Sequence, residues 1–185
     1  MIELLEHPEV RAQVAPLSLD GYHRLRDLGL APIRSELLKG VIVNKVTKSP
    51  LHTLTAHRLW DRLAVGLPPG YQLRKEDPLT LTDSEPEPDL ALVRGTDADF
   101  RTHHPANAEL VVEIAVTSLD LDRAKATVYA AAGVPVYWLV IPLERRVEVC
   151  TEPGAAGYGR VETFGPGDTL ATFYGAAIPL DALFA

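Results

Sequence analysis

The chain has little of several features that define whole classes of protein. Its 185 residues include one cysteine, Cys150, so no internal disulfide can form, and a buried structural thiol is the preferred interpretation. The longest apolar stretch, residues 126–141, is interrupted by Gly133 and Pro135. It is shorter than the ~20 residues that a membrane helix needs. We therefore expect a protein of the reducing cytoplasm, with no membrane segment.

Export signals and positive charge are also scarce. The first residues carry acids and lack the basic end followed by an apolar run that secretion requires. Eighteen Lys and Arg face 25 Asp and Glu, a net charge of −7, which argues against a generic polyanion binder. Contact with DNA would need a local basic patch. Arg58, Arg62, Arg74 and Lys75 are candidates for one, and scattered surface arginines are the ordinary alternative.

The length fits one domain, and we find no internal repeat or low-complexity tract. We divide the chain into an N-terminal arm, residues 1–17, and a single domain, residues 18–185. In the arm, Ile2, Leu4 and Leu5 are apolar before Pro8 breaks the pattern.

Helical spacing and capping residues predict a short helix after Ser18 that ends at Gly29, and a longer helix after Ser49 with Pro50 at its first position. Between them, Lys39-Gly40 predicts a tight hairpin turn in which glycine supplies a positive φ. The remaining predictions are strands at 33–38, 41–46, 71–81, 88–94, 109–116 and 135–141, a helix at 121–132, a second hairpin at 145–150 and 159–164, and a closing apolar segment at 180–184.

Two acids lie in segments that otherwise read as buried strands. Asp89 opens an apolar run, and Glu113 lies inside Leu-Val-Val-Glu-Ile at 110–114. An unpaired buried carboxylate is costly, so it needs a proton, a basic residue or a metal ion. Acids on two neighbouring strands favour Mg²⁺ or Mn²⁺, which takes one or two carboxylates and keeps waters and phosphate oxygens for the rest. That is the chemistry of phosphodiester hydrolysis.

Lys125 follows Glu113 by twelve residues on the predicted helix, and its ammonium group can reach back toward the acids. There it would orient the attacking water or stabilise charge in the transition state. Glu36, in the first hairpin, is a third acid that would hold the metal, its water or the lysine. The alternatives are that Asp89 only starts a strand, that Glu36 and Lys125 are solvated surface charges, and that Glu113 forms a structural salt bridge with Lys125.

Six segments, considered with their order and spacing over most of the chain, carry a resemblance. They are SELLKG (35–40), SPLH (49–52), EPDLALV (87–93), VVEIAVTS (111–118), DRAK (122–125) and YAAAGVPVYWLV (129–140). Together they resemble the Uma-two family of bacterial restriction-endonuclease-like proteins, a branch of the PD-(D/E)XK nuclease superfamily.

The resemblance implies an α/β (α+β) fold with a restriction-endonuclease-like mixed β-sheet core flanked by helices, with an N-terminal helix and hairpin. It implies a Mg²⁺- or Mn²⁺-dependent endonuclease acting on nucleic acid, in particular DNA. The implied roles are metal-binding acids for Asp89 and Glu113, catalytic lysine for Lys125, and helper acid for Glu36. Ala115 stands where the superfamily pattern has a lysine. The base would therefore come from Lys125.

Two other functions stay open. One is a catalytically silent restriction-endonuclease-like module that acts through binding or dimerisation, which the negative charge favours. The other is a glycoside hydrolase that uses the paired acids as general acid and base, although no aromatic-rich sugar platform supports it. By analogy with nucleases that cut two strands with two copies, a homodimer is the assembly to consider.

The histidines give weaker signals. His103 and His104 lie near two aspartates, but without a second ligand pair a solvated loop is favoured over zinc. His52 is a candidate for the entrance of the site.

Overall fold

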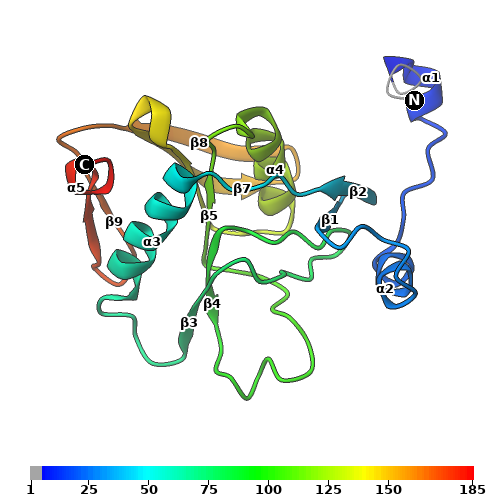
Figure 1. Ribbon diagram of the computed structural model, residues 1–185, viewed down its shortest axis with the longest axis horizontal. Coiled ribbons are helices and arrows are strands. Elements are labelled where there is room, and N and C mark those ends of the chain that lie inside the picture. Colours follow the sequence, from blue (N-terminus) through cyan, green and yellow to red (C-terminus); the bar gives the residue numbers. More distant parts are fainter. Residues whose placement is uncertain (1–5) are drawn as a thin grey trace.

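A six-stranded mixed sheet forms the centre of the computed structural model, which describes residues 6–185 (Figure 1). Its order is β3-β4-β5-β6-β7-β8, and only β5 and β6 run parallel, which confirms the mixed sheet expected from the sequence. The strands are β3 (Tyr71–Arg74), β4 (Leu90–Arg94), β5 (Leu110–Ile114), β6 (Val136–Ile141), β7 (Arg146–Gly154) and β8 (Gly157–Phe164).

Helices cover both faces of this sheet. One core combines α3 with alternate residues of β4 to β6 and with the C-terminal segment, and the other packs α4 on the opposite face. The helices are α1 (Pro8–Arg11), α2 (Leu19–Asp27), α3 (Pro50–Ala64), α4 (Leu119–Ala131) and α5 (Leu180–Leu183), with a 3-10 turn at Pro142–Glu144. None of them, within the described residues, is long and apolar enough to cross a membrane.

The N-terminal helix and hairpin form a smaller unit beside the sheet. Ser18 caps α2 as predicted, and the buried Tyr22 hydroxyl of this helix donates to the Ser35 carbonyl of the hairpin at 2.9 Å. Strands β1 (Ser35–Leu38) and β2 (Val41–Asn44) pair across Lys39 and Gly40, which both have positive φ. Reciprocal backbone hydrogen bonds between Leu37 and Glu85 join β1 to the segment that leads into β4. This contact positions Glu36.

The pleat of the central strands decides which face each acid takes. Leu90 pairs with Val112 across the antiparallel β4–β5 ladder, which brings Asp89 and Glu113 to the same end of the two strands. Side chains alternate along a strand, so Glu113 points to the face that α4 covers, whereas its neighbours Val112 and Ile114 belong to the opposite core.

Several predicted boundaries were wrong. The strand expected at 71–81 ends at Arg74, because Glu76 takes a positive φ of 58° and Pro78 follows. The second hairpin is longer than expected and turns at 155–156. The pair β9 (Thr169–Ala171) and β10 (Ala177–Pro179) was not predicted.

The N-terminal arm contributes little to the sheet. Figure 1 places α1 away from the sheet, and residues 6–9 are exposed. The apolar residues Ile2, Leu4 and Leu5 lie outside the described part of the chain.

Candidate active site

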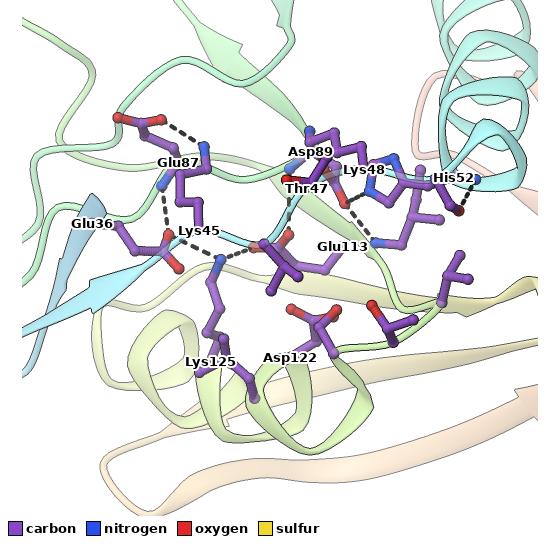
Figure 2. Close-up of a pocket in the computed structure, with 17 residues that line it drawn as sticks. Glu36, Lys45, Thr47, Lys48, His52, Glu87, Asp89, Glu113, Asp122 and Lys125 are labelled. Atoms are coloured by element: carbon purple, nitrogen blue, oxygen red, sulfur yellow. Dashed lines mark hydrogen bonds and ion pairs between the residues drawn. The ribbon is translucent and has the colours of Figure 1, made fainter. Parts of the chain in front are cut away.

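A small pocket lies where β4 and β5 meet the start of α3, the first turns of α4 and the hairpin (Figure 2). Its volume is about 70 Å³, enough for a metal ion and a few waters but not for a nucleotide. The pocket lies among Glu36, Asp89, Glu113 and Lys125, the four site residues predicted from the sequence. Three different parts of the fold supply them, namely the hairpin, the sheet and α4.

Asp89 and Glu113 are linked through the backbone of the two strands. The Ile114 N–H donates to Asp89 Oδ2 at 2.8 Å, and the Asp89 N–H donates to Glu113 Oε2 at 3.4 Å. Both side chains are buried. Asp89 is therefore more than a solvated acid at the start of a strand, because its carboxylate is fixed beside that of Glu113.

Lys125 lies between two acids. Its Nζ is 2.5 Å from Glu113 Oε1 and donates to Glu36 Oε2 at 3.1 Å, and Figure 2 shows it pointing from α4 toward both. Glu36 is 3% exposed and Lys125 is 4% exposed, so the view of them as surface charges was wrong. The salt bridge between Glu113 and Lys125, which was the structural alternative, is present. It does not explain why Glu36 and Asp89 are buried beside it.

Further polar residues line the pocket or contact its acids, and sequence reasoning missed most of them. Tyr129, one turn beyond Lys125, donates its hydroxyl to Glu113 Oε1 at 2.8 Å. Asp122 is also buried and accepts a hydrogen bond from the Ser118 hydroxyl at 2.5 Å. Spacing on the predicted α4 was the available signal, because positions 122, 125 and 129 share one face of a helix.

His52 is in contact with the acids, as its candidacy for the site entrance suggested. Its Nε2 lies 2.9 Å from Asp89 Oδ2, and its Nδ1 is buried without a hydrogen-bond partner in the described chain. The capping of α3 by Ser49 sets this position, because the Ser49 hydroxyl accepts from the His52 backbone N–H at 3.2 Å. The first turn of α3 therefore lies against Asp89.

Two lysines of the segment between β2 and α3 form ion pairs with acids around the pocket. Lys48 Nζ lies 2.7 Å from Asp89 Oδ1, and Lys45 Nζ lies 2.6 Å from Glu87 Oε2. The Glu87 backbone N–H in turn donates to Glu36 Oε2 at 3.1 Å. Neither lysine was identified from the sequence, because a loop lysine next to a capping serine is ordinary.

The ionisation of the two central acids differs. Burial would raise the pKa of Asp89, but the hydrogen bond and charge of His52, together with the ammonium of Lys48, outweigh it and hold this pKa at about 2. Burial raises the pKa of Glu113, and the carboxylates of Asp89, Asp122 and Glu36 raise it further, against the ammonium of Lys125. Asp89 is therefore anionic at neutral pH. Around Glu113, the other carboxylates outnumber the single ammonium group of Lys125, so the charged form of Glu113 is disfavoured.

The surroundings of Lys125 keep it protonated. Burial lowers the pKa of this lysine, but Glu113 and Glu36 outweigh burial and raise the pKa above its ordinary value. The pKa of the Tyr129 hydroxyl is raised well above its ordinary value by burial and by Glu113, so this tyrosine is a neutral donor. Lys125 is thus suited to donating hydrogen bonds and positive charge rather than to accepting a proton.

The oxygen donors fit a hard divalent cation. Four buried acids (Glu36, Asp89, Glu113 and Asp122) surround the pocket, and Lys48 and Lys125 are the lysines in contact with them. Within residues 6–185, no three His, Cys, Asp or Glu side chains are arranged to hold a metal ion by themselves. Mg²⁺ needs only one or two carboxylates with water for the rest, so Asp89 and Glu113 would suffice.

Two members of the suggested basic patch have structural contacts of their own. Arg58 donates to the carbonyls of Leu183 and Ala185 at 2.9 and 2.6 Å, which ties α3 to the C-terminal residues. Arg74 stacks over the Phe100 ring at 5.5 Å. The basic groups beside the pocket are instead Lys45 and Lys48.

The comparisons with known proteins identify a family and a shared fold. The family model Uma2, described as "Putative restriction endonuclease", matches residues 19–180 and spans all four predicted site residues. Among solved structures, the chain is similar to a "putative nuclease belonging to DUF820" from Anabaena variabilis ATCC 29413. The likeness covers 91% of this chain and 98% of that one, with a TM-score of 0.75 and 19% sequence identity, and it shows a shared fold. No curated protein matches the chain.

Proposed function

Since the chain belongs to the Uma2 family of restriction-endonuclease-like proteins, we propose that it is a divalent-metal-dependent endonuclease that hydrolyses phosphodiester bonds of DNA. The observation that carries the proposal is the excess of buried carboxylates over ammonium groups around one pocket. Burying acids without equal positive charge is costly, and a divalent cation relieves that cost. The stability of the fold alone gives no reason to place these buried carboxylates around one pocket.

Asp89 and Glu113 are the residues that would hold the metal ion. When bound, Mg²⁺ or Mn²⁺ supplies an activated water and neutralises charge on the scissile phosphate. Asp89 is anionic at neutral pH, and His52 and the Ile114 N–H fix the orientation of its carboxylate. Glu113 is oriented by the Tyr129 hydroxyl. Both acids are thus held in place by protein groups.

Lys125 would act as a charged donor rather than as a base. Its raised pKa favours the ammonium form, which can hold the attacking water or stabilise negative charge that develops on the phosphate. Glu36 would position this ammonium group through the contact at 3.1 Å. This assignment keeps the two roles that the sequence suggested for Lys125 and departs from the role of base that the resemblance implied.

Calorimetric titration with Mn²⁺ tests the metal site directly. We expect saturable binding by the wild type, and loss of that binding in Asp89→Asn and in Glu113→Gln. Glu109→Gln is the matched control, because this acid immediately precedes β5 but pairs with Arg94 away from the pocket. Equal binding by all four proteins would contradict the assignment of the site.

Cleavage of supercoiled plasmid DNA in Mg²⁺ or Mn²⁺ tests the reaction, with a single-stranded RNA of mixed sequence as the parallel substrate. We expect nicking of the plasmid by the wild type, and a loss of at least about 100-fold in Glu113→Gln and Lys125→Met, as for removal of one transition-state contact. Metal binding without cleavage of either polymer would instead favour the catalytically silent module.

A further inference from the structure

Lys48 makes a contact that the proposed chemistry does not use. Its ammonium group lies 2.7 Å from Asp89 Oδ1 and 3.0 Å from Glu76 Oε1. The Lys48 side chain is 21% exposed, so it lies at the rim of the pocket and not in the core. Figure 2 shows Lys48 and His52 both beside Asp89.

The two oxygens of Asp89 have different partners. Oδ2 interacts with both His52 Nε2 and the Ile114 N–H. Oδ1 has Lys48 as its hydrogen-bond partner among the described residues. A cation that binds Asp89 through Oδ1 must therefore replace the ammonium group of Lys48, whereas the contacts that orient the carboxylate can stay.

Glu76 is a second acid with which Lys48 is paired. The carboxylate of Glu76 is 41% exposed and lies at the rim, and its residue has a positive φ of 58° although it is not glycine. A backbone conformation of this kind is costly and persists only where surrounding contacts hold it. The Glu76 N–H donates to the Pro88 carbonyl at 3.1 Å, which fixes the rim acid next to Asp89.

We propose that Lys48 is a second functional lysine of the site: its ammonium group occupies Asp89 Oδ1 in the metal-free protein, yields this oxygen to a divalent cation, and then binds a substrate phosphate from the rim. The inference rests on the proposed function, because it assumes that Asp89 holds the metal. Displacement leaves Lys48 beside Glu76, with its positive charge no longer balanced by Asp89. A phosphate group of bound nucleic acid would then be the anion available to pair with Lys48.

The first test compares Mn²⁺ affinity by calorimetry in the wild type, Lys48→Met and Lys45→Met. Lys45 is the matched control, because it lies in the same loop, is 15% exposed and pairs with Glu87 rather than with Asp89. Both variants lose one positive charge near the pocket, but only Lys48→Met removes the competitor for Oδ1. We expect Lys48→Met to bind Mn²⁺ about tenfold more tightly than Lys45→Met, the size expected for one charge-assisted hydrogen bond.

The outcomes separate this inference from the proposed function. If the wild type binds Mn²⁺ and Lys48→Met is no tighter than Lys45→Met, the role of Lys48 is refuted and the metal site stands. If neither the wild type nor Lys48→Met binds Mn²⁺, both proposals fail. Lys48→Arg keeps the charge and should stay at the wild-type affinity. Circular dichroism checks the fold, and Lys48→Gln replaces Lys48→Met if the latter does not fold.

The second test addresses the phosphate. Duplex DNA labelled with a fluorophore is titrated with protein in Ca²⁺ at several salt concentrations, and binding is followed by anisotropy. Loss of one phosphate contact should weaken binding by Lys48→Met about tenfold at low salt and reduce the salt slope by about one. Affinity and slope equal to those of the wild type would overturn the contact between Lys48 and phosphate.

Discussion

Replacing Lys125 by methionine removes the positive charge on which two buried acids depend. Methionine is close to lysine in length, so the variant loses the ammonium group without leaving a large cavity. Glu113 and Glu36, at 2.5 and 3.1 Å from Nζ, then remain buried without their cation. Removing one partner of a buried ion pair costs about 3–5 kcal/mol. We expect a loss of this size in the free energy of unfolding at pH 9, where Glu113 is charged in the wild type.

The loss should grow as pH rises through about 8, because Glu113 then gives up its proton in the wild type, where its pKa is about 8, but keeps it in the variant. The pKa of Glu113 is already raised by burial, and Lys125 is the neighbour that lowers it, so the pKa rises further in the variant. The folded variant then holds a proton that the unfolded chain releases above the ordinary carboxyl value of 4.5. Its unfolding free energy therefore falls as pH rises, by at most about 1.4 kcal/mol per pH unit.

Urea unfolding followed by circular dichroism at pH 7 and pH 9, on either side of the wild-type Glu113 pKa, measures both effects. The control is Glu113→Gln. Its side chain keeps an oxygen that can accept the hydrogen bond from the Tyr129 hydroxyl, and Lys125 remains paired with Glu36. We expect this control to change the unfolding free energy by less than about 1 kcal/mol, since it removes a costly buried charge. A loss below about 1 kcal/mol for Lys125→Met at pH 9, or the same loss at pH 7 and pH 9, would refute the reasoning.

Three further predictions use other groups. Because the pKa of Asp89 is lowered to about 2, its contribution of about 2 kcal/mol is present at neutral pH and is lost as pH falls from about 4 to 2. Urea titrations in acid should show this loss in the wild type and not in Asp89→Asn. Burial raises the pKa of Cys150 to about 11, so mass spectrometry should find iodoacetamide labelling at pH 8 about 100-fold slower in the native protein than in urea. Tyr22→Phe removes the hydroxyl bonded to Ser35 and should cost about 1 kcal/mol in urea unfolding, and an unchanged midpoint would show that this bond adds nothing.

The acids of the site could be predicted from the sequence because an acid within or beside an apolar segment is unusual. A glutamate inside Leu-Val-Val-Glu-Ile has no favourable place in a core strand unless something pairs with it, and the structure gives Glu113 such a partner in Lys125. The starts of two helices were also predictable, since Ser18 caps α2 and Ser49 caps α3, the helix that carries His52, as expected. Local chemistry was sufficient in these cases.

The partners of Asp89 were less accessible to sequence reasoning. Lys48 and Glu76 are 28 residues apart in the sequence and meet at Asp89 only because the strands are paired as they are. Because the predicted strand at 71–81 was too long, it included Glu76, and this acid at the rim was not recognised. Asp77-Pro78 was a signal for a break. Such contacts depend on tertiary arrangement, and periodicity along the chain does not contain that information.

The contact between Glu36 and Lys125 joins positions 89 residues apart, and it has a consequence for the order of folding. Such a contact closes a long loop at an entropic cost, so we expect it to form after the sheet has paired and the hairpin has docked on the segment around Glu85. A chain still emerging from the ribosome holds Glu36, Asp89 and Glu113 before it holds Lys125. The four charges meet only where the hairpin and α4 have both docked beside the sheet, so the activity proposed for this site would require both elements in place.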